Sequence, residues 1–265
     1  MGYLSFFKLR FAMGLQYRFS ALAGLATQFF WGMMMLFLYE AFYKNGISTS
    51  LGWQELVSYI WLGQAFYTVV FFRNPDKDIF ECIKNGQVAY EFVRPLNLYW
   101  MWFVKICAQR LSACVLRFLP VIIFACSLPT TYSLKGPDSI FALFLFFCTV
   151  MLGLVISTAL TMLIYILMFF TTSCKGLFTI YGNIADFFSG MTLPIAFMPS
   201  AVQAICFILP FRLCMDLPMR LYVGNIPVSE GLQTFLVQIA WAMALTMLGN
   251  YMMQKVGKRL VIQGG

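Results

Sequence analysis

Charged side chains within apolar stretches are the residues of this sequence most able to carry chemistry. Asp186 lies nine residues past Leu177, where one apolar stretch begins, and Arg110 and Arg117 lie in another. On insertion scales a charge at the centre of a membrane helix costs about 2.5–3.5 kcal/mol, so these residues should face protein or a polar cavity. Two uses are open for Asp186: structural pairing with another charge, or a place in a gate or substrate path.

Arg117 is the candidate partner of Asp186. Arg117 lies seven residues beyond Arg110, which is about 10 Å along a helix, and Asp186 lies at a similar depth from the same side. Two opposite charges offset part of each other's desolvation, which favours an intramembrane Arg117–Asp186 ion pair. In the alternative, Arg117 reaches the headgroups through its long side chain, and Asp186 is protonated or meets another partner.

The common catalytic arrangements are missing from the sequence. It has no histidine, and its eight cysteines include no C-x-x-C pair, which removes the usual zinc sites and histidine-activated nucleophiles. Neither a G-x-x-x-x-G-K-S/T phosphate loop nor a G-x-S-x-G elbow is present. We therefore expect no enzyme activity, no metal site and no cofactor bound by this chain.

The composition predicts that lipid surrounds the chain. Of 265 residues, 61% are hydrophobic and 11% are charged, and the mean hydropathy is +0.80, whereas soluble domains carry about 25% charged residues. A helix needs about 20 apolar residues to cross a bilayer. Six segments qualify, so residues 1–265 should form a single all-α transmembrane domain with six transmembrane helices. The segments are residues 21–42, 56–72, 107–128, 140–170, 177–197 and 232–253.

One predicted span is unusually long, and two other segments should not cross. Residues 140–170 are uncharged throughout, which suits one long helix that is tilted or broken. Residues 1–20 interleave Lys8 and Arg10 with Phe7 and Phe11, as in a helix that lies in the membrane interface. Residues 198–231 contain an apolar run at 201–211, about 16 Å as a helix and too short to span. We expect an external re-entrant segment there, before the last helix; a capping loop is the alternative.

The basic residues predict the orientation. With the N-terminus inside, 14 of the 18 lysines and arginines fall on the cytoplasmic side and four outside. An even number of spans then places both termini in the cytoplasm, with the chain as a multi-pass protein of the plasma membrane. The basic residues lie between spans rather than along one stripe. The net charge of +8 therefore indicates anchoring beside anionic membrane lipid, and no nucleic-acid binding is expected.

Residues 73–98 form the largest predicted cytoplasmic feature. Asn74 or Asp76 can cap a short amphipathic helix, Phe80 and Ile83 contribute to its apolar face, and Gly86 ends it. Beyond Gly86 the chain should run extended into the next span. A short exposed helix with apolar residues and both charge signs suits docking into a partner's groove; a solvated connecting loop is the alternative.

Two motifs carry a resemblance to a known family. IKNGQVAYEFVRPLNLY, at 83–99, resembles a cytoplasmic signature of that family. SGMTLPIAFMPSAVQ, at 189–203, with LPF at 209–211, resembles its motif of small residues, glycine and prolines that closes the fifth span. With the order of the predicted elements, they resemble the permease subunits of the second class of ABC-type exporters (ABC-2 type), in its short, half-size branch. The resemblance covers essentially the whole chain.

The resemblance implies partners and site residues. Two permease subunits, identical or sister chains, would pair in a bacterial membrane and bind two ABC ATPase subunits, which hold ATP and Mg. Residues 76–86 would be the coupling helix, with ATPase-coupling residues Asp76, Asp78, Phe80, Glu81, Ile83 and Gly86. ATP binding would shift the first, second and fifth spans. The residues predicted for the gate or translocation path are Asn183, Asp186, Ser189, Gly190, Pro194 and Pro199.

Three functions are compatible with these patterns. The first is a permease subunit for ATP-driven export of a hydrophobic or amphipathic substrate (drug, peptide or lipid), because spans with few polar groups do not suit a small hydrophilic solute. An ion-coupled secondary transporter is the second, although that class usually shows internal repeats and several intramembrane acids, and here only Asp186 is present. The third is a non-transporting membrane scaffold or a lipid-modifying enzyme, against which the lack of histidine and of clustered acids counts.

Overall fold

The protein is all-helical. The computed structural model describes residues 2–16, 18–46, 49–70, 72–73, 75–92, 96–171 and 173–259, and in these ranges it contains helices and no strand. The predicted all-α fold is therefore confirmed for this part of the chain.

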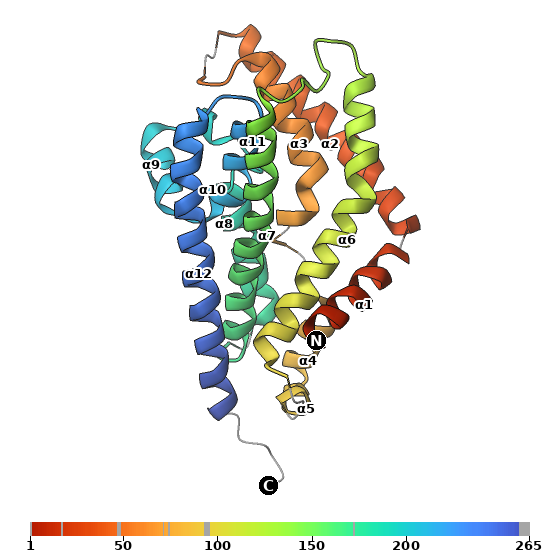
Figure 1. Cartoon of the computed structure of the whole chain (residues 1–265), viewed down its shortest axis with the longest axis vertical. Helices are drawn as coiled ribbons and strands as arrows, with labels where there is room; N and C mark the ends of the chain where they lie inside the picture. The colour runs from red at the N-terminus through yellow and green to blue at the C-terminus, as the bar shows by residue number, and fades with distance from the viewer. Residues whose placement is uncertain are drawn as a thin grey trace.

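Four helices are long and apolar enough to cross a bilayer. They are α2 (Arg18–Lys44), α6 (Leu98–Ser127), α7 (Ile140–Met168) and α12 (Val228–Arg259). At 27 to 32 residues each, all four exceed the thickness of the hydrocarbon core, about 30 Å. In Figure 1, α6, α7 and α12 follow the long axis of the molecule, and α2 crosses it obliquely. The uncharged run at 140–170 forms one unbroken helix, and the chain is a multi-pass membrane protein.

The other two predicted spans are shorter helices. α3 (Trp53–Val70) has 18 residues and ends about halfway along the molecule in Figure 1, while α8 (Cys174–Phe188) has 15. The predicted fifth span, 177–197, is thus not one continuous helix. α8 stops because Gly190 has a φ of +84°, which residues with a Cβ rarely adopt, and a Cβ there would lie 2.8 Å from Tyr59 Oη. Six crossings therefore remain a prediction.

Short helices complete the end of the molecule where α12 ends (Figure 1). α1 (Gly2–Gln16) packs along α6, and α4 (Lys77–Lys84) and α5 (Val88–Phe92) lie beside the start of α6 (Figure 1). The chain after Gly86 was expected to be extended, but it forms the single turn of α5, whose Val88 is buried. Local propensity gives way there to the burial of an apolar side chain.

The segment at 198–231 folds back onto the protein at the other end. After the 3₁₀ turn η1 (Ile195–Phe197), α9 (Ser200–Ile208) presents apolar side chains outward, with Ile208 73% exposed. α10 (Phe211–Cys214) and α11 (Asp216–Tyr222) pack against α7. Gln238 of α12 donates hydrogen bonds from Nε2 to the carbonyl oxygens of Thr149, at 2.7 Å, and Leu213, at 3.0 Å. The last long helix therefore holds this returning segment in place.

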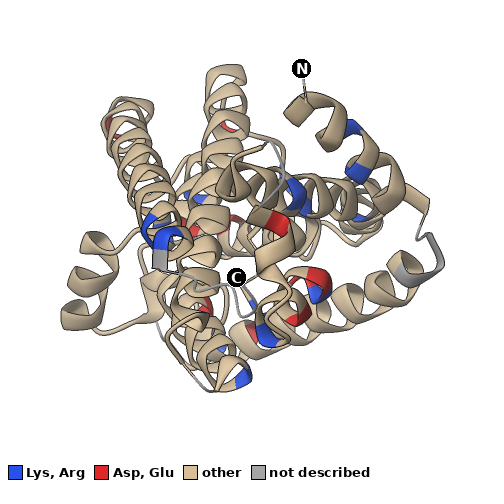
Figure 2. Ribbon diagram, turned by 90° about the horizontal axis from the view of Figure 1, so that it is seen from below, with Lys and Arg blue, Asp and Glu red and all other residues tan. Residues whose placement is uncertain are grey.

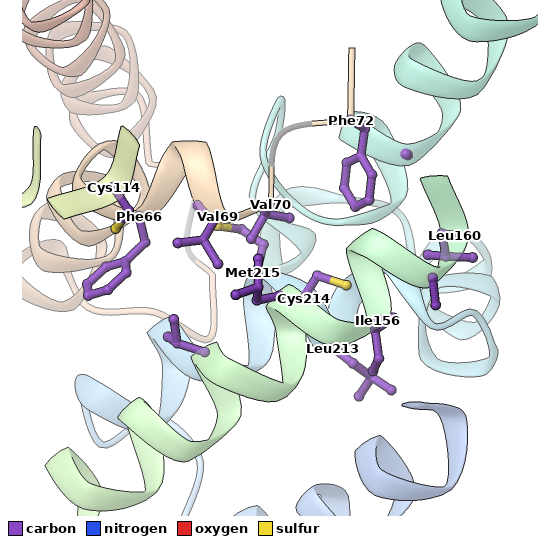
Figure 3. Close-up of a cluster of buried hydrophobic side chains, with 14 of the residues drawn as sticks. Phe66, Val69, Val70, Phe72, Cys114, Ile156, Leu160, Leu213, Cys214 and Met215 are labelled. Carbon is purple, nitrogen blue, oxygen red and sulfur yellow. The ribbon is translucent and has the colours of Figure 1, made fainter. Parts of the chain in front are cut away.

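The apolar core lies where α3, α6, α7 and α10 meet. Figure 3 shows Phe66 and Val70 of α3, Ile156 of α7 and Leu213 of α10 in one cluster. Gly153 of α7 lets the backbone of α10 approach, because a Cβ there would lie 2.9 Å from the carbonyl oxygen of Cys214. The eight cysteines are all free thiols, and most serve as small apolar side chains.

Candidate functional site

The predicted cytoplasmic helix is present as α4. Asp76 is its N-cap, since Asp76 Oδ1 accepts a hydrogen bond from the backbone N–H of Ile79 at 2.9 Å. The helix ends at Lys84, and Gly86 follows with a φ of +70°. α4 is strongly amphipathic, so its two faces have different surroundings.

The apolar face of α4 packs on its own chain. Ile79 and Ile83 are buried, and the ring of Phe80 lies against Phe178 of α8, with centroids 6.2 Å apart. Phe80 and Ile83 were predicted to couple to an ATPase; Phe80 is half-buried and Ile83 is buried in the chain by itself, and their coupling role stays a prediction. An apolar stripe on a short helix is buried against the nearest apolar surface, which here belongs to α7 and α8.

A buried lysine fixes the N-terminal end of α4. Lys105 Nζ of α6 lies 2.7 Å from Asp76 Oδ1 and 2.7 Å from Asp78 Oδ2. The side chains of Lys105 and Asp76 are 5% and 3% exposed, whereas that of Asp78 is 72% exposed. Asp76 also donates its backbone N–H to Tyr165 Oη of α7 at 2.6 Å. Asp76 therefore anchors α4 to the membrane domain, and its predicted role in ATPase coupling stays a prediction.

The hydrogen bond from Lys105, together with its charge, lowers the pKa of Asp78 below the ordinary value of 3.8. The Asp78 carboxylate is therefore held in its charged form beside the buried amine.

The outward face of α4 is polar and free to meet a partner. Glu81 and Lys84 are exposed there, and so is the turn at 85–87 that contains Gly86. Tyr90 of α5 stands beside them with 79% of its surface exposed. Of the residues predicted for ATPase coupling, Asp78, Glu81 and Gly86 are accessible on this surface.

A cavity of about 450 Å³ lies between α2, α3 and the turn that follows α8. Its wall mixes aromatic rings with neutral polar side chains and a few charges. The charged residues that line it are Arg73, Arg117 and Asp186, and the others used below are Gln28, Trp31, Tyr39, Tyr59, Gln64, Tyr67, Gly190 and Pro194.

Asp186 forms its ion pair with Arg73 in place of the predicted Arg117. The Asp186 side chain is 5% exposed and Oδ2 accepts from Arg73 Nε, while Oδ1 has no hydrogen-bond partner within the described ranges. Arg73 reaches Asp186 because α3 ends at Val70, halfway along the molecule, so the chain after it lies at the depth of Asp186. Arg117 lines the same cavity, and its Nε also has no partner among the residues described.

The predicted gate residues divide into three groups. Asp186, Gly190 and Pro194 line the cavity. Ser189 is buried and donates its hydroxyl to the carbonyl oxygen of Asp186 at 3.1 Å, which supports the end of α8. The remaining two, Asn183 and Pro199, are exposed and do not line this cavity.

Three residues that the sequence did not single out are central to the site. Arg73 and Lys105 each form an ion pair with a buried acid, and the Tyr59 hydroxyl lies 3.3 Å from both the Gly190 carbonyl oxygen and Asp216 Oδ1. Lys105 stood just before a predicted span and Arg73 just after one, where a cation is ordinarily an anchor for headgroups. The sequence offered one signal for these two residues, which is that each cation lies at the boundary of a predicted span and could meet an acidic residue there.

α4 and the cavity are connected through α8. Phe178, which packs on Phe80, precedes Asp186 by eight residues on the same helix. A displacement of α4 would therefore act on the helix that carries the Asp186–Arg73 pair. Helices transmit such shifts as rigid bodies when their packed surfaces have discrete alternative positions.

In a comparison with known families, the family described as "ABC-2 family transporter protein" matches residues 29–264, which is most of the chain. No curated protein matches the chain.

Proposed function

The chain belongs to the ABC-2 transporter family, and we propose that it is the permease subunit of an ATP-driven exporter. The family forms the membrane component of ABC transporters, which implies association with a separate ABC ATPase. The observation that carries the proposal is the division of α4: its apolar face and Asp76 are fixed to the membrane domain, and its polar face is exposed. A helix held in this way can pass on force that a partner applies to it.

The partner surface consists of Glu81, Lys84, the turn at 85–87 and Tyr90. Interfaces are enriched in tyrosine, which supplies a large contact at a small cost in conformational entropy. Charges of both signs on α4 would fix the register of a partner more than its affinity. ATP binding would draw two such partners together, move α4, and act through Phe178 on α8.

The cavity between α2, α3 and α8 is the proposed part of the translocation route. Aromatic walls from Trp31, Tyr39 and Tyr67 suit an apolar body, while Gln28 and Gln64 suit a polar end. The substrate would be hydrophobic or amphipathic. A second permease subunit, identical or a sister chain, would complete the route, and the chain would sit in a bacterial plasma membrane.

The proposed orientation places both termini, α4 and α5 in the cytoplasm. Cysteines introduced at exposed Lys84 and Lys258, after replacement of the native cysteines, should resist an impermeant reagent in intact cells. A cysteine at exposed Lys135, in the loop before α7, should react. Labelling of the cysteine at position 84 in intact cells would show that the orientation is the opposite of the one proposed.

The coupling role is tested by co-purification with the ATPase and by its hydrolysis rate. Glu81→Arg and Tyr90→Ala should each reduce the amount of ATPase that co-purifies and lower transport-linked hydrolysis. Glu230→Arg is the matched control, because Glu230 is equally exposed at the opposite end of the protein. Equal recovery of ATPase with all three variants and the unmodified chain would refute docking at α4.

An ion-coupled transporter remains the second candidate, and the Arg73–Asp186 pair is the observation that favours it. Buried ionisable pairs in membrane proteins often lie on ion pathways. Substrate movement driven by a proton or sodium gradient without ATP would support that candidate against the first.

A further inference from the structure

A second cavity, of about 660 Å³, lies beside α1 and the N-terminal end of α4. Most of its lining comes from α1, the N-terminal end of α4 and the middle of α6, and α2, α3 and α7 contribute the rest. It is distinct from the cavity proposed for transport, although Arg117 lines both. We propose that it binds the phosphate of an anionic glycerophospholipid.

The wall of this cavity carries more basic than acidic groups. Four cations line it, from α1, α4 and α6, against two acids, Asp76 and Asp78. Both acids already lie 2.7 Å from the buried amine of Lys105. The lining cations are Arg10, Lys77, Arg110 and Arg117. Figure 2 views this end of the molecule and shows the basic residues of α1 on the helix that begins at the N-terminus.

Two of these arginines have a buried N–H donor that forms no hydrogen bond with any described residue. The Nε atoms of Arg10 and Arg117 are both inaccessible and have no hydrogen-bond partner within the described ranges. The nearest charged partner of Arg10 is Asp78, at 3.9 Å, beyond hydrogen-bond distance. A buried donor without an acceptor costs about 1–3 kcal/mol, and a phosphate oxygen would satisfy it through a charge-assisted bond.

The apolar part of the wall favours a lipid over free phosphate. Met13 of α1 lines the cavity, is 41% exposed, and shares its helix with Leu9, which is 58% exposed. Ile106 and Leu116 of α6 line the same space. The acyl chain of a bound lipid would cover this apolar surface as it extends out of the cavity, whereas a bound inorganic anion would not cover it. A net negative headgroup is preferred, since a choline group would bring a further cation into a basic site.

The test measures lipid retained by the full-length chain. The protein is reconstituted in phosphatidylcholine nanodiscs with an increasing fraction of phosphatidylglycerol. It is then exchanged into detergent, and the bound lipids are counted by native mass spectrometry. The unmodified chain should retain phosphatidylglycerol with saturation. Arg10→Gln and Arg117→Gln should each weaken retention at least about tenfold, the loss expected for one charge-assisted bond.

Lys8→Gln is the matched control, because Lys8 is an exposed cation of the same helix that does not line the cavity. Retention should be unchanged in this variant. Arg10→Lys keeps the charge and should retain more phosphatidylglycerol than Arg10→Gln does. This difference shows that the loss in Arg10→Gln comes from the binding site and not from misfolding of α1. Equal loss in Lys8→Gln and Arg10→Gln would overturn the site and indicate general attraction by surface charge.

A further experiment tests whether the site binds an intact lipid or any soluble phosphate. Glycerol phosphate added to protein in pure phosphatidylcholine should not protect the chain from thermal unfolding, whereas phosphatidylglycerol should. Equal protection by both would overturn the lipid assignment and leave a site for soluble phosphates.

Discussion

Replacement of Lys105 by methionine should release α4 from the membrane domain. Methionine has nearly the volume of lysine, so the change removes the charge and its two contacts without opening a large cavity. It leaves the Asp76 carboxylate, 3% exposed, without the ammonium group that lies 2.7 Å away in the unmodified protein.

The two contacts of Lys105 differ in their expected contribution. Removal of one partner from a buried ion pair costs about 3–5 kcal/mol, and this applies to Asp76. The contact with Asp78 involves a side chain that is 72% exposed, and such pairs contribute about 0–1 kcal/mol because water screens them. Lys105→Met should therefore lower the free energy of unfolding by roughly 3–5 kcal/mol, nearly all through Asp76.

A double-mutant cycle with Asp76→Asn isolates this contact. Asparagine keeps an N-cap oxygen for the N–H of Ile79 while removing the buried charge. The double variant should be more stable than the sum of the single losses predicts, with a coupling of about 2–3 kcal/mol. Reversible unfolding in mixed micelles, followed by tryptophan fluorescence, gives these free energies. Lys84→Met is the control, since Lys84 is an exposed lysine of α4 whose removal should change stability little.

The pH dependence provides a second readout of the same site. The folded-state pKa of Asp78 lies below its unfolded value of 3.8, so its contribution is fully present above pH 3.8 and is lost as the pH falls below that value. Lys105→Met should abolish this part of the acid dependence. Additive losses in the cycle, or unchanged stability of Lys105→Met, would show that Lys105 does not anchor α4.

Two further predictions follow from contacts inside the membrane domain. Gly153→Val should destabilise the protein by about 1–3 kcal/mol, because the backbone of α10 occupies the space and cannot rotate away. Gly136→Val is the control: no atom lies within 4 Å of a Cβ added there, so the unfolding midpoint should not change. Arg73→Gln and Asp186→Asn should show a coupling of about 1–3 kcal/mol in unfolding measurements, whereas Arg117→Gln with Asp186→Asn should be additive. Coupling confined to the Arg117 pair would reverse the assignment of the ion pair.

The sequence predicted the long helices well because their hydrophobicity is a local property. The uncharged run at 140–170 had to be helical in lipid, and it forms a single helix that ends at Met168. The amphipathic α4 was also predictable, since its cap and its apolar spacing are contained in eight residues.

The sequence did not predict which surfaces of the chain contact each other. Periodicity identifies the apolar face of α4, but it does not say whether Phe80 meets a partner or α8. In the same way, the sequence indicated that Asp186 needs a partner of opposite charge, whereas the choice of Arg73 as that partner depended on α3 ending early. That ending is a tertiary feature, since residues 71–72 are apolar and would allow the helix to continue.

The contact of Gln238 with the carbonyl oxygens of Thr149 and Leu213 has a consequence for the biosynthesis of the chain. The ribosome delivers α9, α10 and α11 before α12, so these short helices reach the membrane while the amide that holds them is not yet synthesised. Until α12 inserts, the Leu213 carbonyl at the break between α10 and α11 lacks this donor. The end of the protein that these short helices form should therefore be the last part to reach its final structure, and a nascent chain that stops before α12 should present residues 198–231 to membrane proteases.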